Sequence, residues 1–208
     1  NSGNGTYAYI DSMAEARKVF LTDLTGTLYT VAKDVKFQIE FNPAFVDSYR
    51  LIGYENRQLA DRDFTDDTKD AGEVGSGHQV TAIYELVPAG VGTNQAATGN
   101  LRYQTARQQV EKSELMNIKV RYKTPEGTKS TEFVQAVVLP QNWDKELSFA
   151  NASGDTRFAS SVAAFGMLLR GSAHAGQADM DWVYKTALNA LEQDPGGYRS
   201  GFCELVRK

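Results

Sequence analysis

The sequence predicts an α+β protein: an antiparallel, sandwich-like β-sheet preceded by one long helix and followed by a small C-terminal helical unit. Two observations favour the sheet. Apolar and polar residues alternate over residues 35–41, and strand-like segments return at residues 115–122 and 131–139. A third observation concerns the connections, since no helical pattern lies between these strands to carry a parallel crossover. Helical spacing of apolar residues is confined to the two ends of the chain.

The first long element is a helix that begins near Ser12. Ser12 and Glu15 have the spacing of a capping box, in which the hydroxyl accepts a hydrogen bond from an otherwise unpaired backbone amide. Gly26 and the threonines around it predict a break or bend near residues 25–27. We expect the apolar stripe of this helix either to pack on the sheet or to mediate self-association. The stripe consists of Met13, Ala16, Phe20, Leu24, Leu28 and Val31.

The strand over residues 35–41 is expected to bury one face. Its apolar residues are Val35, Phe37, Ile39 and Phe41, and they alternate with Lys36, Gln38 and Glu40. Further strands are predicted at residues 49–54, 78–87, 115–122 and 131–139. Thr124–Gly127 has the composition of a turn between the last two strands. The glycine-rich residues 72–78 are interpreted as a turn, and residues 88–112 as a loop.

The C-terminal part, from residue 148, changes to helical spacing. A helix that begins near Asp155 is predicted to end before Gly171, which is a candidate C-cap residue. Two further helices are predicted at residues 178–193 and 198–207. Because no Pro-rich or Gly/Ser-rich linker separates these helices from the strands, we expect them to pack on the sheet.

Composition excludes several classes of protein. The chain has 208 residues, a net charge of -4 and one cysteine, so it forms no intramolecular disulfide. Lys and Arg are dispersed, and a nucleic-acid interface would need a basic patch that displaces phosphate counterions. No apolar stretch is long enough to cross a bilayer, and the first residues lack the pattern of a secretory signal.

One loop is crowded with carboxylates, and it is the first candidate site. These residues are Asp61, Asp63, Asp66, Asp67, Asp70 and Glu73. A flexible loop with several carboxylates is what calcium prefers, yet the spacing of an EF-hand fails, because the sixth and twelfth positions counted from Asp61 are Asp66 and Gly72. Arg57, Arg62 and Lys69 are near enough to offset the charge. The alternatives are a solvated acidic loop and a bound cation.

The remaining reactive residues form no recognised catalytic set. Ser76 and His78 are adjacent to the acidic loop but lack a nucleophile-elbow pattern, and His174 lies between two helices far along the chain. The string GEVGSGH lacks the Lys-Ser/Thr ending of a phosphate-binding loop. Cys203 lies among apolar residues and is interpreted as buried. The sequence therefore assigns no catalytic, cofactor-binding or metal-binding residue.

Several long strings resemble the C-terminal domain of bacterial von Willebrand factor type A proteins of the YfbK type. The strings are YAYIDSMAEARKVF, AKDVKFQIEFNP, YRLIGYENR, DFTDDTKDAGEVGSGHQVTAIYELVP, VRYKTPEG, FASSVAAFGMLLRGS and GYRSGFCELV. The resemblance implies that residues 1–33 are the last strand, over residues 7–10, and last helix of the A domain. Residues 34–147 then form the antiparallel β domain, and residues 148–208 form a helical unit packed on it.

The resemblance also implies a role and a place. It implies a cell-envelope protein, periplasmic or at the surface, with an anchor in a missing N-terminal segment. Because the residues form no recognised catalytic set, cofactor fingerprint or complete metal set, we expect a non-catalytic accessory domain. Its partners would be the A domain of the same protein and an unknown envelope protein. The Asp-x-Ser-x-Ser motif through which A domains bind a metal is absent, so no metal ligand or cofactor is carried over. The alternative is a calcium-binding module or a hydrolase that uses the acidic loop and His78.

Overall fold

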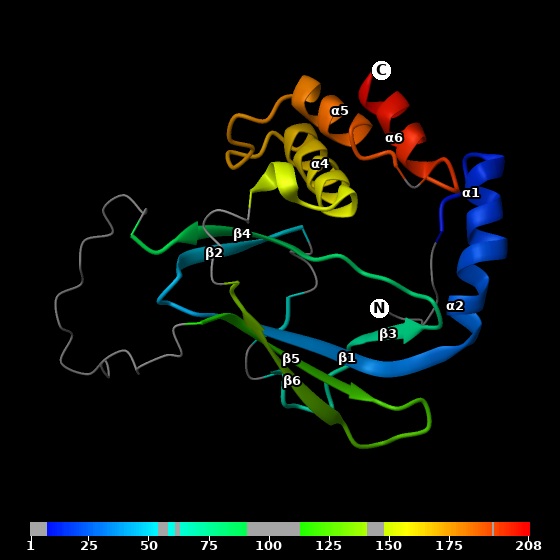
Figure 1. The fold of residues 1–208 in the computed structure, drawn as a ribbon. Coiled ribbons are helices and arrows are strands. Elements are labelled where there is room, and N and C mark those ends of the chain that lie inside the picture. The colour runs from blue at the N-terminus through cyan, green and yellow to red at the C-terminus, as the bar shows by residue number, and fades with distance from the viewer. Residues whose placement is uncertain (1–7, 54–57, 61–62, 91–112, 141–147, 193) are drawn as a thin grey trace. The chain divides into compact units, whose positions relative to one another are not determined.

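The computed structural model describes residues 8–53, 58–60, 63–90, 113–140, 148–192 and 194–208 (Figure 1). The chain divides into two compact units. The first comprises Asn1–Asp47, Arg57–Val80 and Pro88–Val138, and the second comprises Ser48–Asn56, Thr81–Val87 and Leu139–Lys208. The helices and antiparallel strands confirm the predicted α+β class. The expected boundaries at 33/34 and 147/148 stay predictions.

The first unit opens with a continuous helical segment whose middle departs from α-helical geometry. It consists of α1 (Met13–Arg17), the π-helix η1 (Lys18–Asp23) and α2 (Leu24–Leu28). The predicted start is confirmed, because the Ser12 hydroxyl accepts a hydrogen bond from the Glu15 amide at 3.1 Å. The change in helical geometry precedes residues 25–27, where a bend was expected.

Two expectations around this helix are wrong. Residues 8–11 form no strand, and residue 7 lies outside the described residues. Val31 does not continue the helical stripe, because α2 ends at Leu28 and Val31 belongs to β1 (Thr30–Phe41). Within the apolar stripe, Phe20 is 58% exposed and Leu24 is 43% exposed, so these two side chains are not buried against the sheet, and self-association, the other alternative, stays a prediction.

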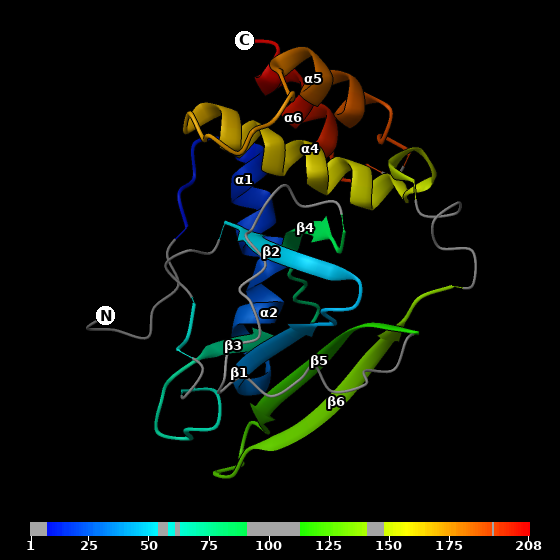
Figure 2. The same cartoon turned by 90° about the vertical axis from the view of Figure 1, so that its left-hand side faces the viewer.

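The first unit is built on a four-stranded antiparallel sheet of order β3-β1-β5-β6 (Figure 2). Its strands are β1, β3 (Gly72–Gly75), β5 (Glu114–Lys123) and β6 (Thr131–Val138). The predicted turn between β5 and β6 is confirmed by a hydrogen bond from the Gly127 amide to the Thr124 carbonyl at 2.9 Å. The Gly-rich segment was expected to be a turn, but its first residues pair with β1 and the turn is confined to Ser76 and Gly77.

Opposite residues across the strands give the sheet one polar and one apolar face. One row joins Lys36, Arg121 and Glu132, and the neighbouring row joins Phe37, Val120 and Phe133. The expected burial of Phe37 is wrong, since Lys36 is 2% exposed whereas Phe37 is 63% exposed. The pairing of β1 with β5 shifts between Lys33 and Lys36, and an acidic loop covers the polar face at Lys36.

The second unit contains most of a two-stranded sheet, formed by β2 (Val46–Ile52) and β4 (Ile83–Pro88). It also contains the helices α4 (Gly154–Leu169), α5 (Met180–Leu188) and α6 (Tyr198–Val206). The strand predicted at 78–87 therefore begins later than expected. The 3₁₀ helix η4 (Phe149–Asn151) precedes α4. The core of this unit is apolar. It is formed by Ala164, Met167 and Val183, with Ile52, Phe165, Leu168, Phe202 and Val206 packed against them.

Side chains and glycine set the ends of these helices. The Ser153 hydroxyl accepts from the Thr156 amide at 3.1 Å, and the Asp179 carboxylate accepts from the Trp182 amide at 2.7 Å. Gly171 adopts a φ of +61°, which confirms it as the residue that ends α4. The helix expected over residues 178–193 is shorter, because Asn189 ends α5.

Candidate functional site: the acidic loop

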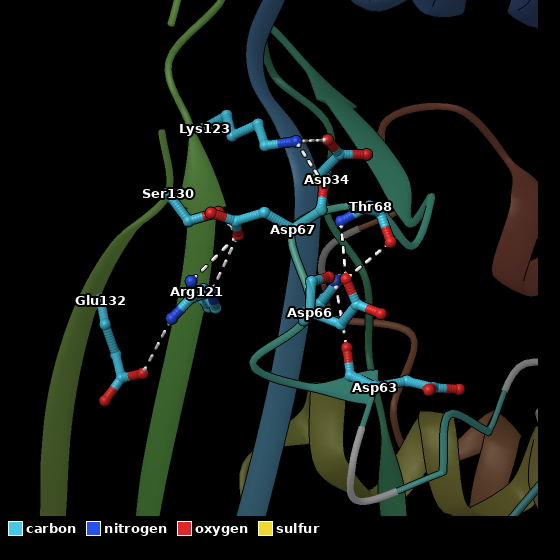
Figure 3. Close-up of polar contacts among 10 residues, drawn as sticks. Asp34, Asp63, Asp66, Asp67, Thr68, Arg121, Lys123, Ser130 and Glu132 are labelled. Atoms are coloured by element: carbon cyan, nitrogen blue, oxygen red, sulfur yellow. Dashed lines mark hydrogen bonds and ion pairs between the residues drawn. The ribbon is translucent and has the colours of Figure 1, made fainter. Parts of the chain in front are cut away.

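The acidic loop, residues 61–73, lies on the polar face of the four-stranded sheet, and the structure describes it from Asp63 onward (Figure 3). Phe64 anchors the loop, since its side chain is buried. The neighbouring carboxylates do not converge on one point. Instead, the Asp67 carboxylate accepts from Arg121 on β5 and from Ser130 before β6, while Asp34 of β1 accepts from the Ala71 amide of the loop and from Lys123.

Asp67 is the carboxylate most strongly held by the sheet. Its Oδ1 accepts hydrogen bonds from the Ser130 hydroxyl at 2.5 Å and from Arg121 Nη2 at 3.0 Å. The Ser130 hydrogen bond, followed by the Arg121 guanidinium, lowers the pKa of Asp67 from 3.8 to about 2. Arg121 also lies 3.8 Å from Glu132, so it joins the loop to both β5 and β6.

Lys123 connects the loop to the start of the sheet. Its ammonium lies 2.7 Å from Asp34 Oδ2 and donates to the Asp67 carbonyl at 3.0 Å. The hydrogen bond between Lys123 and Asp34 lowers the pKa of Asp34 and raises the pKa of Lys123. Asp34 has a φ of +51°, and its other carboxylate oxygen accepts from the Ala71 amide at 3.3 Å. Asp34 is thus held in an uncommon backbone conformation while it joins β1 to the end of the loop.

Lys36 holds the middle of the loop through backbone carbonyls. Its ammonium donates to the carbonyl oxygens of Asp63 at 3.2 Å and of Asp66 at 2.5 Å. The Asp66 carboxylate turns back on its own segment, where it accepts from the Thr68 amide at 2.9 Å and the Thr68 hydroxyl at 2.6 Å. The Thr68 hydroxyl bond is the main reason that the pKa of Asp66 is lowered. A protein cation therefore organises oxygens that a bound ion could otherwise hold.

The sequence-predicted site residues are only partly brought together. Asp63, Asp66 and Asp67 share the docked loop, and Glu73 accepts from the Thr30 hydroxyl at 3.5 Å, while Asp61 lies outside the described residues. Asp70 is exposed. Within the described ranges, no group of three or more His, Cys, Asp or Glu side chains is arranged to hold a metal ion.

The other candidate residues are dispersed. His78 and His174 are both exposed and belong to different units. The turn at Ser76 is held by its backbone amide, which donates to the Tyr29 carbonyl at 2.8 Å, and no hydrogen bond between the Ser76 and His78 side chains is present among the described residues. Cys203 is buried as predicted, and burial raises the pKa of its thiol, which disfavours the reactive thiolate.

The cations that matter most were missed by reading the loop alone. Lys36, Arg121 and Lys123 come from the strands, whereas the expected counter-charges Arg57 and Arg62 both lie outside the described residues. The usable signal was the two-residue period of the strands, which places Lys36 on the polar face of β1. The pairing of Lys36 with Arg121 depends on the register between β1 and β5, which the sequence of neither strand predicts alone.

We expect calcium to leave the stability of the chain unchanged, because the Asp67 carboxylate and the Asp63 and Asp66 carbonyls already have protein donors. Thermal unfolding with millimolar calcium, and with a chelator as the control, measures this. A ligand that binds the folded state at 100 times its dissociation constant would add about 2.7 kcal/mol. A rise of several degrees that is abolished by Asp63→Asn with Asp67→Asn would contradict the expectation.

Acid should weaken the contact between the loop and the sheet. The pKa of Asp67 is about 2 in the folded protein and is ordinarily 3.8, so its stabilising effect is fully present above the ordinary value and is lost as the pH falls through about 2. Urea unfolding at a series of pH values should show a steeper acid loss for the wild type than for Asp67→Asn. Glu126→Gln, in the exposed turn, is the control and should follow the wild type; parallel curves for Asp67→Asn would refute the assignment.

The described residues define an α+β protein in which one unit has an antiparallel sheet with a docked acidic loop and the other has helices with an apolar core. The chain belongs to the family described as Uncharacterized protein YfbK, C-terminal, which matches residues 26–208. The family resemblance inferred from the sequence is thereby confirmed. The match begins inside α2.

A relative from Escherichia coli (strain K12) carries the name Uncharacterized protein YfbK. It is 40% identical to this chain over 207 residues, which cover 98% of this chain and 34% of the relative. The chain thus spans about a third of the length of that relative. No solved structure matches the chain. In the described part of the chain, no helix combines the length and apolar character needed to cross a membrane.

Proposed function

We propose that this chain is a non-catalytic accessory and interaction domain of a bacterial cell-envelope protein that carries a von Willebrand factor type A domain. Its role would be to support protein–protein interaction or adhesion, with the A domain of the same protein and an envelope protein as partners. The observation that carries the proposal is the helical segment Met13–Leu28, whose large apolar side chains are exposed. They are Met13, Phe20, Leu21, Leu24 and Leu28.

An exposed set of this kind is costly for a protein in water. Each large apolar side chain gains roughly 1.5–3 kcal/mol when it is moved fully out of water. A contiguous apolar patch on a soluble protein commonly marks an interaction site. The segment also stands at the border of the family match, which begins at residue 26 within α2. Together these points favour a partner that lies in the part of the longer relative that this chain does not span.

The acidic loop supports an interaction role over a catalytic one. Its central carboxylate and carbonyl oxygens accept from Lys36, Arg121, Lys123 and Ser130, which are parts of the fold. Catalytic carboxylates generally need a substrate or a proton to act on, and their pKa values are shifted towards the working pH. The pKa of Asp67 is shifted the other way, to about 2. This loop therefore fits a structural role in an interaction domain.

Hydrogen exchange over residues 13–28 tests the proposal, measured on this chain with and without the A domain. We expect the A domain to slow exchange there, and Phe20→Asp to remove that protection because an exposed apolar contact becomes a charge. Val80→Asp is the matched control, since Val80 is 64% exposed outside any helix or strand. An unchanged exchange rate, or hydrolase turnover that is lost in His78→Ala, would overturn the proposal.

A further inference from the structure

β6 is an edge strand whose outer side is open in the described part of the chain. In the order β3-β1-β5-β6 it pairs with β5 alone, and Figure 2 shows it at the outer border of the sheet. An edge strand presents a row of backbone amide and carbonyl groups that can pair with another strand. Soluble proteins commonly protect such edges with charges, prolines or bulges.

β6 carries little of this protection. Its sequence is TEFVQAVV, and the charged residue, Glu132, lies near its start, 3.8 Å from Arg121. The stretch Phe133–Val138 contains no charge and no proline. Phe133 is 51% exposed and Val134 is 55% exposed, and neighbouring residues of a strand point to opposite faces. The strand is therefore open above and below as well as at its edge.

We propose that β6 pairs in an antiparallel manner with β6 of a second copy of this chain, so that two sheets become one. The strand is self-complementary when a two-fold axis passes through Gln135. Phe133 then lies opposite Val137 of the other copy, which is a favourable pairing of an aromatic with a β-branched residue. Glu132 lies opposite Val138, so no two carboxylates face each other.

The lack of charge is the reason for choosing a second copy as the occupant. A symmetric contact sets each side chain near the axis against its own counterpart, so any charge there would oppose itself. Gln135, the residue at the axis, is exposed and uncharged, and its amide donates to the Ala136 carbonyl at 2.8 Å. In the proposed pairing, the apolar row of Phe37, Val120 and Phe133 continues into the second copy through its Val137.

Charge reversal at the axis provides the test. Sedimentation equilibrium of the whole chain at low salt should show a reversible dimer. Gln135→Glu and Gln135→Lys should each raise its dissociation constant by about fivefold, because like charges then meet across the axis. An equimolar mixture of the two variants should form a mixed dimer at least as tight as the wild type. Gln79→Glu, an exposed glutamine outside the strands, is the matched control and should leave the dimer unchanged.

Four results would overturn the proposal. A wild-type chain that stays monomeric over the whole concentration range contradicts it, as does a dimer that resists both Gln135 variants. A dimer that is lost in Phe20→Asp yet kept in the Gln135 variants would place the contact on the helix instead. Slow hydrogen exchange of β6 amides in a monomer would mean that another strand occupies the edge. The results at β6 and Gln135 do not bear on the protection of residues 13–28 by the A domain, which hydrogen exchange measures separately.

Discussion

Gly75→Ala is expected to destabilise the first unit by about 3 kcal/mol, at the upper end of the cost of overpacking. A Cβ at this position would overlap the carbonyl oxygen and the carbonyl carbon of Gly26, which are backbone atoms and cannot rotate away. β3 and α2 are in direct contact here, so the strand or the helix would have to move. The urea midpoint of unfolding, followed by circular dichroism, measures the loss.

Gly72→Ala is the matched control for this prediction. Gly72 begins the same strand, and a Cβ there would meet no atom within 4 Å. Neither glycine has a positive φ, so the two substitutions differ in space and not in backbone strain. We expect Gly72→Ala to be neutral or to stabilise by about 0.5 kcal/mol through the unfolded chain. Equal losses for the two variants would show that the contact of Gly75 with Gly26 does not limit stability.

Lys36→Met should cost about 3 kcal/mol of unfolding free energy. Methionine has a similar length and fills the space, but it removes the ammonium that donates to the carbonyl groups of Asp63 and Asp66. The backbone amides of Asp66 and Lys69, at 3.4 Å and 3.3 Å, remain as their longer donors. Lys36 is 2% exposed, so water cannot readily replace the ammonium. The loss should appear both in urea unfolding and as faster hydrogen exchange in the acidic loop.

Lys119→Met separates this effect from a change in overall charge. Lys119 lies on the same face of β5 as Arg121, and Lys119→Met removes one positive charge, as Lys36→Met does. Its side chain makes no hydrogen bond among those of the described residues, and we expect a change within about 0.5 kcal/mol. If the two variants were equally destabilised, the buried contacts of Lys36 would not be the cause.

Local patterns were enough to locate many elements. The Ser12 cap, the turn at Thr124–Gly127 and the end of α4 at Gly171 follow from short-range chemistry, and each lies where the sequence indicates. Strands β5 and β6 also lie within a residue of their predicted bounds. These features depend on residues that are neighbours in the chain, which is why one sequence could predict them.

The features that were missed depend on residues far apart in the chain. β3 is a strand because β1 lies beside it, and its Gly75 is needed because α2 approaches. Lys36 is buried because a loop far along the chain closes over it, and the two carbonyls that it contacts lie 27 and 30 residues later. Periodicity can assign a side chain to a face, but it cannot say what covers that face.

The short connection between helix and sheet has a mechanical consequence. α2 ends at Leu28 and β1 begins at Thr30, so Tyr29 alone separates them. A pulling force on the helical segment would pass through one residue into β1, with no slack to absorb it. β1 is paired on both sides, with β3 and with β5, and both hydrogen-bonded ladders would have to yield before it slid. Tension applied at the helix would therefore be shared by the centre of the sheet.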